Sequence, residues 1–434
     1  MIPSVFEVLP GGALRGRIRV PGDKSISHRA LMLGAIADGV TEVTGFLEGE
    51  DTLATLAAFR DMGVDIERDG DRVRVIGAGM TGLRAPSGPL DLGNSGTSMR
   101  LLCGLLAGQS FDCTLTGDAS LSRRPMRRVT EPLARMGARI ETTAAGTAPL
   151  TIRGGGPLHG TDHVLDVASA QVKSCLLLAG LYADGRTRVT EPAPSRDHTE
   201  RMLRAFGHPV AVDGHRITVG GGGRLCGRRV EVPADLSSAA FFIVGATIAP
   251  GSDLTIEGVG VNPTRTGVIE ILRQMGADIA VVNERLQGAE PVADLHVRAA
   301  DLRGIAIAPA LVPLAIDEFP AIFVAAACAD GETVLSGAAE LRVKESDRIA
   351  VMANGLRTLG IYARPTPDGM VIRGGAFTGG AVDSHGDHRI AMALATAALR
   401  AEGPMRIADC ANVATSFPGF VDLARTTGLR IEGR

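Results

Sequence analysis

The stretch SISHRALMLGAIADGVTEVTG, residues 25–45, contains a pattern that returns along the whole chain. Polar residues are followed by a run of small apolar residues, then a glycine, then a β-like segment. The six copies are residues 25–45, 95–117, 169–191, 237–258, 318–337 and 387–410. The small-residue runs are apolar on nearly all sides, and a helix of that kind is buried. We therefore expect six buried helices, one in each copy.

A second pattern follows each copy: a helix that ends at a glycine, then one or two strands. The six glycines are Gly63, Gly137, Gly207, Gly276, Gly360 and Gly428, at spacings of 74, 70, 69, 84 and 68 residues. Glycine just past a helix is the expected left-handed stop. The second helices carry Arg, Asp and Glu, so we expect them to face solvent. The repeat is thus about 70 residues long. Its hydrophobic periods predict a β-α-β-α-β-β order.

The sixth copy stops before its last strand. Residues 4–12, SVFEVLPGG, resemble the segments that end earlier copies at 71–79 and 368–375. We predict that this N-terminal strand completes the C-terminal domain, so that the ring of repeats is circularly permuted.

A solenoid is the alternative, but solenoid repeats of this kind are usually ~20–45 residues long. The predicted fold is α/β (α+β) with two similar domains of three βαβαββ repeats each, residues 21–235 and residues 1–20 with 236–434.

Composition excludes several classes of function. The net charge of −3 over 434 residues argues against a general nucleic-acid or anionic-membrane surface. The six cysteines are widely scattered and form no CxxC pair, which is typical of reduced thiols in an intracellular protein. The N-terminus resembles no signal sequence, and no apolar stretch of spanning length is free of charge or glycine. We expect a cytoplasmic protein without a membrane or nucleic-acid partner.

The chain has three lysines, Lys24, Lys173 and Lys344, and 42 arginines. Lysine is a compact, rotatable charge, whereas arginine is a larger planar fork that stays charged. Each lysine lies in a polar cluster that opens an apolar run, at residues 21–29, 169–174 and 342–348. We infer that arginine could not perform the task of these lysines. A nucleotide-composition bias is the alternative.

Polar and charged residues gather where the expected buried helices begin. They are Lys24, Ser25 and Arg29; Asn94, Ser95 and Gly96; Ser169 and Gln171; Asp317 and Glu318; and Asp387, His388 and Arg389. A helix N-terminus favours phosphate or carboxylate, and a cation in the first turn opposes the helix dipole. These positions therefore indicate a bound anion, and the basic loops 122–128 and 341–348 add further cations. For Ser237 and Ser238, at the fourth helix start, we favour an N-cap.

Familiar cofactor motifs do not match. GDKS at 22–25 lacks the spacing of a P-loop, and the glycine-rich segments 154–160 and 219–224 lack a following helical pattern. SHGDH at 384–388 has neither an HExxH spacing nor a cysteine partner for zinc. We expect no metal and no cofactor, and an enzyme that acts on small anions.

Seven segments in order resemble the 5-enolpyruvylshikimate-3-phosphate synthase family over essentially the whole chain. They are PGDKSISHRALMLGAIADG (21–39), LGNSGTSMR (92–100), GDASLSRRPM (117–126), SAQVKS (169–174), DEFP (317–320), RVKESDR (342–348) and GDHRIAM (386–392). Each is weak alone, but their order and spacing are specific. The resemblance implies an enolpyruvyl-transferase-like fold whose two domains close over a cleft.

The resemblance also implies a reaction and a site. The enolpyruvyl group of phosphoenolpyruvate passes to the 5-hydroxyl of shikimate 3-phosphate through a tetrahedral intermediate, and phosphate is released. Shikimate 3-phosphate would contact Lys24, Ser25, Arg29, Ser169, Ala170, Gln171, Ser195, Arg196, Asp317 and Lys344. Phosphoenolpyruvate would contact Lys24, Asn94, Gly96, Arg124, Gln171, Glu345, Arg348, His388 and Arg389. The implied catalytic residues are Asp317, as base towards the 5-hydroxyl, Glu345, as proton donor and acceptor at the methylene carbon, and Lys24.

Three positions depart from much of the family. Thr415 stands where many members have lysine, Leu101 where one large branch has proline, and Lys173 is absent from that branch. We expect a structural ion pair at Lys173.

Glyphosate mimics phosphoenolpyruvate in this family, and Gly96 leaves room for it, so we predict inhibition, weakened by Leu101. We expect a monomer that functions in aromatic amino-acid biosynthesis.

Two alternatives compete with this function. The enolpyruvyl transferase for UDP-N-acetylglucosamine shares the fold, but its reactive cysteine falls at Ala119 here. The other alternative is a non-catalytic, anion-binding paralogue.

Overall fold

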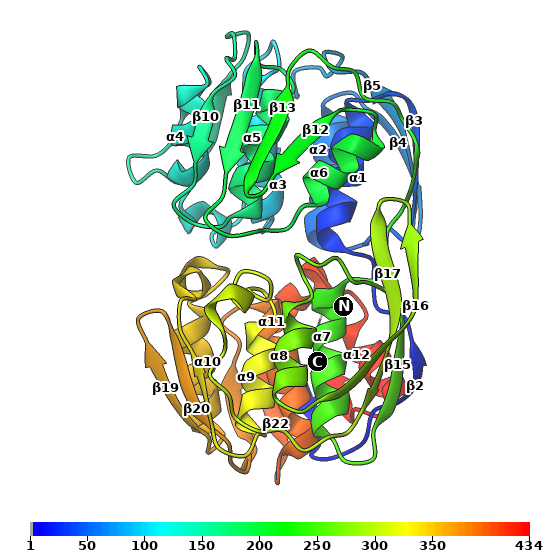
Figure 1. Ribbon diagram of the computed structural model, residues 1–434, viewed down its shortest axis with the longest axis vertical. Coiled ribbons are helices and arrows are strands. Elements are labelled where there is room, and N and C mark those ends of the chain that lie inside the picture. Colours follow the sequence, from blue (N-terminus) through cyan, green and yellow to red (C-terminus); the bar gives the residue numbers. More distant parts are fainter. Residues whose placement is uncertain (1–2) are drawn as a thin grey trace. The chain divides into compact units, whose positions relative to one another are not determined.

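The computed structural model describes residues 3–434, and the chain divides into two compact units (Figure 1). The first unit contains the residues up to Pro21, Pro233–Leu286 and Glu290–Arg434. The second unit contains Gly22–Val232 and Gln287–Ala289. Each unit is built from three repeats, and each repeat contributes two α-helices and one sheet. The predicted α/β architecture of two similar domains with three repeats each is therefore correct.

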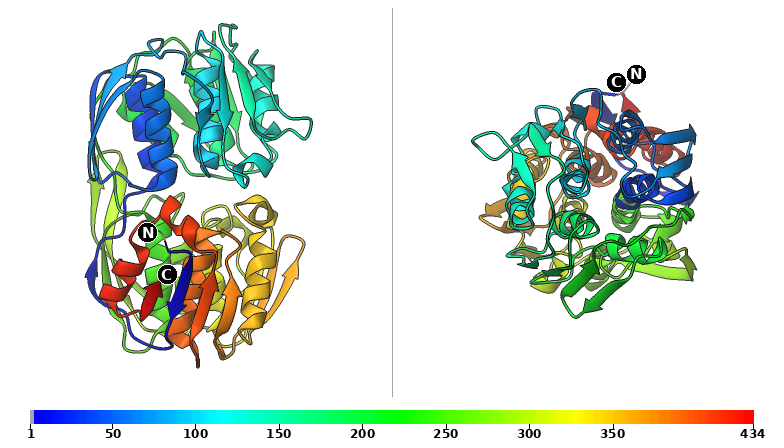
Figure 2. Two further views of the ribbon diagram at one scale, coloured as in Figure 1. Left: turned by 180° about the vertical axis from the view of Figure 1, so that it is seen from behind. Right: turned by 90° about the horizontal axis from the view of Figure 1, so that it is seen from above.

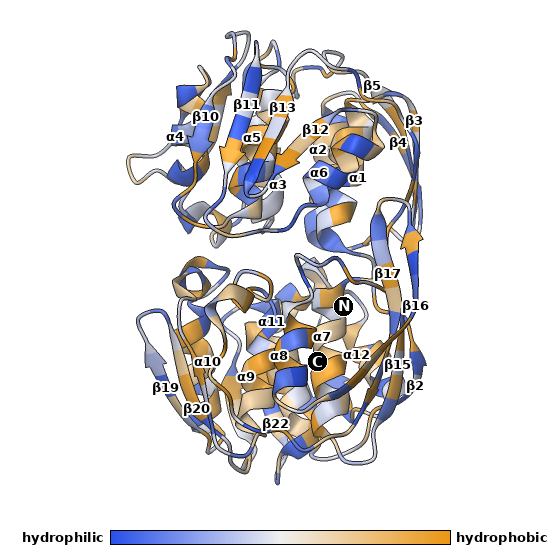
Figure 3. Ribbon diagram, viewed as in Figure 1, coloured by the Kyte–Doolittle hydropathy of each residue, from blue (hydrophilic) through white to orange (hydrophobic). Residues whose placement is uncertain are grey.

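One helix of every repeat is buried. These helices are α1 (Lys24–Ala35), α3 (Gly96–Ala107), α5 (Ala170–Gly180), α7 (Leu236–Ile248), α9 (Phe319–Ala327) and α11 (His388–Ala397). Every residue of α7 and α9 is buried, and Figure 3 shows both largely in the hydrophobic colour. The prediction of six buried helices is confirmed. Small apolar side chains on all sides allow neighbours to pack around each helix.

The second helix of every repeat is amphipathic and ends at the predicted glycine. These helices are α2 (Glu50–Asp61), α4 (Arg127–Arg135), α6 (His198–Ala205), α8 (Gly267–Gln274), α10 (Arg348–Thr358) and α12 (Phe420–Thr427). The glycines that follow them have φ between 84° and 118°. Only glycine adopts this left-handed conformation without strain, which explains the regular stops.

The second unit contains three four-stranded sheets of one pattern, in the orders β14-β3-β5-β4, β6-β7-β9-β8 and β10-β11-β13-β12. The first strand pairs parallel with its neighbour, and the other pairs are antiparallel. The strands are β3 (Asp38–Thr44), β4 (Asp65–Asp69), β5 (Arg72–Ala78), β6 (Leu90–Asp91), β7 (Cys113–Thr116), β8 (Arg139–Glu141), β9 (Leu150–Arg153), β10 (Asp162–Val164), β11 (Arg186–Thr190), β12 (Val210–Asp213), β13 (Arg216–Gly220) and β14 (Arg229–Glu231).

The first unit repeats the pattern with sheets in the orders β16-β17-β15-β2, β18-β20-β19 and β21-β22-β1-β23. Its strands are β1 (Val5–Val8), β2 (Arg15–Ile18), β15 (Asp253–Gly260), β16 (Asp278–Gln287), β17 (Glu290–Arg298), β18 (Glu332–Leu335), β19 (Tyr362–Thr366), β20 (Gly369–Arg373), β21 (Gly380–Asp383), β22 (Met405–Ala408) and β23 (Ile431–Gly433). In the three-stranded sheet, a single bridge from Ala306 to Val334 takes the place of the first strand.

Strand β1 completes the sixth repeat. It lies between β22 and β23 and pairs antiparallel with both, so that Phe6 faces Ile407 on one side and Gly433 on the other. This is the place that β5, β9 and β13 occupy in the second unit. Figure 2 shows the first and last strands of the chain side by side. The predicted circular permutation is confirmed.

The strands that precede α1 and α7 are exchanged between repeats. Strand β2, just before α1, pairs parallel with β15 of the first unit. Strand β14, just before α7, pairs parallel with β3 of the second unit. Each unit therefore uses one strand from the connection that leads into the other unit. Among residues 3–434, no helix has both the length and the apolar character that crossing a membrane requires.

Candidate functional site

Helix α1 presents its polar cluster at its N-terminus. The Asp23 carboxylate caps the helix by accepting from the Ile26 backbone N–H at 2.9 Å. The Lys24 ammonium lies 2.9 Å from the Asp51 carboxylate of α2, and the Lys24 side chain is 16% exposed. This pair holds Lys24 at the helix start while leaving it accessible. Asp51 was not predicted, although its place in the acidic first turn of α2 was a signal.

Arg29 ties three helices together. Its Nε donates to the Thr199 hydroxyl of α6 at 2.7 Å, and one terminal nitrogen donates to the Ser174 hydroxyl of α5 at 2.7 Å. The other terminal nitrogen donates to the Ser25 carbonyl at 2.9 Å. These contacts fix a buried guanidinium directly behind Lys24 and Ser25.

His28 lies behind the same cluster and links α1 to α2. Its Nδ1 is 2.8 Å from the Thr55 hydroxyl, and the ring is fully buried. Burial, together with the positive charges of Lys24 and Arg29, holds the pKa of His28 well below its usual range. The imidazole is therefore neutral near pH 7 and contributes no charge to the site.

Gly96, Asn94 and Arg124 come together at the start of α3. Arg124 donates to the Asn94 side-chain oxygen at 2.6 Å. A Cβ atom on residue 96 would stand only 2.9 Å from a terminal nitrogen of Arg124. Glycine is thus the residue that lets this guanidinium approach the helix N-terminus.

The starts of α3 and α5 are joined through Gln171. Its Nε2 donates to the Thr97 hydroxyl at 3.0 Å, and its oxygen accepts from Arg100. Ser169 caps α5 by accepting from the Val172 backbone N–H at 3.4 Å, which places Ala170 in the first turn. Arg100 was not predicted as a site residue. The available signal was an arginine in the second turn of a buried helix, as at Arg29.

Lys173 follows Gln171 on α5 and is buried in an ion triplet. Its ammonium lies 2.8 Å from the Glu191 carboxylate and 2.7 Å from the Glu200 carboxylate. The expected structural ion pair is therefore present, with a second carboxylate that was not predicted. Burial lowers the pKa of Lys173, but Glu200 and Glu191 outweigh it and raise the pKa overall.

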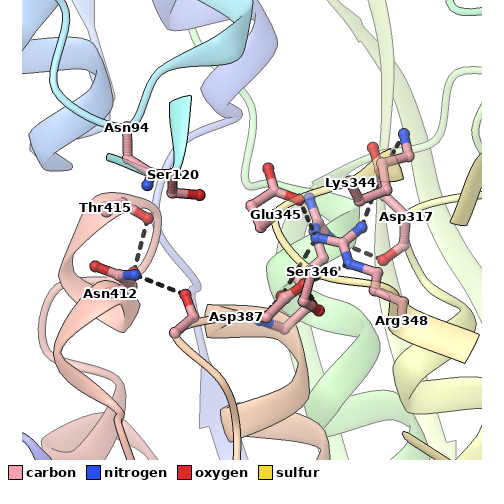
Figure 4. A network of polar contacts seen from close by, with 12 residues as sticks. Asn94, Ser120, Asp317, Lys344, Glu345, Ser346, Arg348, Asp387, Asn412 and Thr415 are labelled. Atoms are coloured by element: carbon pink, nitrogen blue, oxygen red, sulfur yellow. Dashed lines mark hydrogen bonds and ion pairs between the residues drawn. The ribbon is translucent and has the colours of Figure 1, made fainter. Parts of the chain in front are cut away.

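The first unit holds a second cluster, centred on the buried guanidinium of Arg348 (Figure 4). Nε donates to Asp387 at 2.8 Å, and the two terminal nitrogens contact Glu345 at 2.6 Å and Asp317 at 3.4 Å. The Lys344 ammonium lies 3.2 Å from Asp317. Both predicted proton-transfer carboxylates thus share one arginine. Burial lowers the pKa of Arg348, but the three carboxylates, Asp387 foremost, raise it above its ordinary value.

Asp387 is the central residue of this cluster; the sequence places it at a helix start that indicates a bound anion, but assigns it no role towards either substrate. It is fully buried, accepts from Ser346 at 3.0 Å and caps α11 through the Arg389 backbone N–H at 3.0 Å. His388 and Arg389 form the first turn of α11, and Arg389 donates to the Asp317 carbonyl at 3.1 Å. The helix starts of α9, α10 and α11 therefore bring together the predicted residues of this unit.

The predicted N-cap role of Ser237 and Ser238 is wrong. Asp235 caps α7 by accepting from the Ser237 backbone N–H at 2.8 Å. The Ser237 hydroxyl donates instead to Glu318, and the buried guanidinium of Arg265 donates to that hydroxyl at 2.6 Å. An aspartate just before the serines competes for the cap because its carboxylate is the stronger acceptor.

A family model described as EPSP synthase (3-phosphoshikimate 1-carboxyvinyltransferase) matches residues 8–423. The chain belongs to the EPSP synthase family. A 3-phosphoshikimate 1-carboxyvinyltransferase of Methylococcus capsulatus is 70% identical over 429 residues, which cover 99% of this chain and 98% of the relative. One of Alkalilimnicola ehrlichii is 71% identical over 428 residues, covering 98% and 96%. A solved structure of EPSP synthase from Acinetobacter baumannii matches with a TM-score of 0.88 and 59% identity, and covers 99% of both chains.

In this EPSP synthase family member, residue 415 is threonine, where the resemblance predicts a lysine. The Thr415 hydroxyl donates to the Asn412 carbonyl at 2.7 Å, and Asn412 Nδ2 donates to the Gly386 carbonyl at 2.6 Å (Figure 4). Thr415 is buried, so its side chain stabilises the turn before α12. Within residues 3–434, no three His, Cys, Asp or Glu side chains are grouped to hold a metal ion.

Proposed function

We propose that this chain transfers the enolpyruvyl group of phosphoenolpyruvate to the 5-hydroxyl of shikimate 3-phosphate and releases phosphate. The observation that carries the proposal is the pair of carboxylates, Asp317 and Glu345, held on the buried guanidinium of Arg348 beside Lys344. Two positioned acid–base groups amid cations suit a reaction that moves protons on polyanions. Membership of the EPSP synthase family supports the same reaction.

The helix starts of the second unit supply anion-binding groups. Lys24, Arg29 and Arg124 lie at or near the N-termini of buried helices, where the helix dipole and backbone N–H groups already favour anions. We propose that Lys24, Ser25, Arg29, Ser169, Ala170, Gln171, Ser195 and Arg196 bind shikimate 3-phosphate, together with Asp317 and Lys344. Arginine forks pair with phosphate or carboxylate through two parallel hydrogen bonds.

The residues proposed for phosphoenolpyruvate come from helix starts of the second unit and from helix starts of the first. We propose that Lys24, Asn94, Gly96, Arg124, Gln171, Glu345, Arg348, His388 and Arg389 bind this substrate. The close approach of Arg124 to Gly96 supports this assignment, because a guanidinium at a helix start with no Cβ in between can hold a compact anion.

The addition step needs one base and one acid. Asp317 accepts the proton of the 5-hydroxyl while the oxygen of that hydroxyl bonds to C2 of phosphoenolpyruvate. The electron pair of the C2–C3 double bond takes a proton from Glu345 at C3, which gives the tetrahedral ketal. Positioned proton donors and acceptors typically contribute ~10²–10⁴-fold each.

The elimination step reverses the role of Glu345. Its carboxylate removes a proton from the C3 methyl group, the C2–C3 double bond re-forms, and the C2–O bond to phosphate breaks. Phosphate leaves with the electron pair of that bond. Glu345 lies 2.6 Å from Arg348 and is therefore held as a carboxylate by a positive charge. An anionic substrate that binds Arg348 weakens this hold and favours the protonated acid.

Two observations favour this transfer over transfer to UDP-N-acetylglucosamine. UDP-N-acetylglucosamine transfer would call for a cysteine at Ala119, and the matched relatives are 3-phosphoshikimate 1-carboxyvinyltransferases. We also propose that the two units act as the two domains of the enzyme, and that it works as a cytoplasmic monomer. Light scattering of the purified protein would test the monomer.

Phosphate release tests the function. The purified enzyme is incubated with phosphoenolpyruvate and either shikimate 3-phosphate or UDP-N-acetylglucosamine. We expect release with shikimate 3-phosphate only, and its loss in Asp317→Asn. Release with UDP-N-acetylglucosamine would support the other transferase, and release with neither acceptor would overturn the catalytic proposal.

A further inference from the structure

The ammonium of Lys173 has one acceptor for each of its three N–H donors. It contacts the Glu191 carboxylate at 2.8 Å, the Glu200 carboxylate at 2.7 Å and the Ser195 carbonyl at 3.3 Å. All three charged side chains are at most 3% exposed. A lysine head group has three donors, so this arrangement satisfies it completely.

The three acceptors span one loop. Glu191 directly follows β11, Ser195 lies in the middle, and Glu200 is in the first turn of α6. The Ser195 hydroxyl also donates to Glu191. The loop 191–197 contains Pro192 and Pro194, which have no backbone N–H to donate. The Lys173 ammonium therefore holds the beginning of this loop through the Glu191 carboxylate, its middle through the Ser195 carbonyl, and the helix that follows it through the Glu200 carboxylate.

A neighbouring contact continues the link between α5 and α6. The Thr199 hydroxyl donates to the Ser174 hydroxyl at 2.7 Å, and Arg29 donates to both residues at 2.7 Å. Consecutive residues of α5, Lys173 and Ser174, thus contact consecutive residues of α6, Glu200 and Thr199. The loop that joins β11 to α6 is fixed to the same helix that carries Gln171.

Stability alone does not account for such a triplet. Well-packed apolar side chains in place of a buried ion pair are often as stable or more stable. Burial raises the pKa of Glu200, although Lys173 opposes the shift, so the charged form of this carboxylate is costly here even beside an ammonium. A costly arrangement that defines one loop conformation points to a role in positioning.

We infer that the buried triplet of Lys173, Glu191 and Glu200 is a positioning device that holds the loop carrying Ser195 and Arg196 for shikimate 3-phosphate. The inference rests on the proposed function, in which these two residues bind that substrate. It also explains why position 173 is lysine. A planar guanidinium cannot direct its donors to three acceptors arranged around one nitrogen.

Binding of shikimate 3-phosphate, measured by calorimetry on the whole enzyme, tests the inference. Lys173→Met removes the ammonium and keeps the chain length. If that variant does not fold, Lys173→Met with Glu191→Gln and Glu200→Gln removes all three charges and keeps an acceptor for Ser195. We expect affinity for shikimate 3-phosphate to fall roughly tenfold, about 1.4 kcal/mol, with the KM for phosphoenolpyruvate changed less than about twofold.

Arg196→Gln measures the loop's direct contribution, and the combination with the triplet variant measures coupling. We expect the loss of affinity in the combined variant to be smaller than the sum of the two separate losses, because both changes disturb the Arg196 contact. Leu177→Ala, a buried change further along α5, is the control for lost stability and should keep the affinity of the unchanged enzyme.

The possible outcomes distinguish failure of the positioning role from failure of the proposed substrate site. If Arg196→Gln weakens binding but the folded triplet variant binds as well as the unchanged enzyme, the positioning inference fails and the proposed site stands. Additive losses in the combined variant would also overturn the inference. If Arg196→Gln leaves the affinity unchanged, the proposed role of the loop fails and the inference fails with it.

Discussion

The guanidinium of Arg348 donates to the carboxylate of Asp387 at 2.8 Å, and the same carboxylate caps helix α11. One fully buried aspartate therefore orients both a candidate substrate-binding arginine and a helix start that carries His388 and Arg389. The contact both stabilises the fold and prepares Arg348 for substrate, because a guanidinium that is already fixed loses little conformational freedom on binding.

Asp387→Asn tests this contact. Asparagine can still cap α11, but it leaves the buried charge of Arg348 with one carboxylate fewer. We expect the free energy of unfolding to fall by about 3 kcal/mol, the scale for breaking a buried ion pair, and kcat to fall as well. Chemical denaturation measures the first effect. Arg17→Met, which breaks the exposed Arg17–Glu257 pair of the same unit, should cost less than about 1 kcal/mol.

Lys24→Arg should fold normally and lose most activity. The guanidinium can still pair with Asp51. Its larger planar head group cannot reproduce the compact charge of the ammonium that lies 2.9 Å from that carboxylate. We expect kcat/KM to fall by about 10²-fold, the effect of misplacing a reacting group by about 1 Å. Circular dichroism should be unchanged. Retention of most of the activity would contradict the assignment of Lys24 to the site.

Gly96→Ala should weaken phosphoenolpyruvate binding and glyphosate inhibition together. The added Cβ would lie 2.9 Å from Arg124, so the guanidinium or the helix start must shift. We expect the KM for phosphoenolpyruvate to rise and the glyphosate concentration for half inhibition to rise further. The matched control is Gly88→Ala, since nothing lies within 4 Å of a Cβ there. Strong glyphosate inhibition of Gly96→Ala would argue against the site.

Glu345→Gln should remove the proton donor at C3. We expect kcat to fall by ~10²–10⁴-fold, and incorporation of solvent deuterium into the methylene group to stop. Mass spectrometry of the substrates and product after turnover in heavy water measures the exchange. Glu332→Gln, an exposed carboxylate of the same unit, is the control and should exchange normally. Continued exchange in Glu345→Gln would shift the role to another acid.

His28 should make the protein less stable in acid. Its pKa is lowered in the folded state, so the unfolded chain binds the proton more readily below the ordinary histidine pKa of about 6.5. The stabilising contribution of the neutral imidazole is full above that pH and falls as the pH drops towards the folded pKa. Each such proton costs about 1.4 kcal/mol per pH unit. Urea unfolding at pH 7.5 and 5.5 should show a smaller loss for His28→Asn, and an equal loss would refute the assignment.

The repeat architecture was predictable from local features. The six glycine stops, the small-residue runs and the resemblance of residues 4–12 to two later segments were enough to predict buried helices and the place of β1. These features are readable because a helix end or a hydrophobic period depends on residues a few positions apart. The exchange of β2 and β14 between repeats was not predictable, since either strand pattern fits either sheet.

The candidate site was predictable in residue type but not in pairing. The three lysines and the helix-start arginines stood out by composition and position, and the family resemblance supplied their expected roles. What the sequence could not show was that Lys173 meets Glu191 and Glu200, or that Asp387 holds Arg348, 39 positions away. By itself the sequence determined the repeats, the helix ends and the family. Only the tertiary structure decided which buried charges neutralise each other, because that depends on how distant segments pack and exclude water.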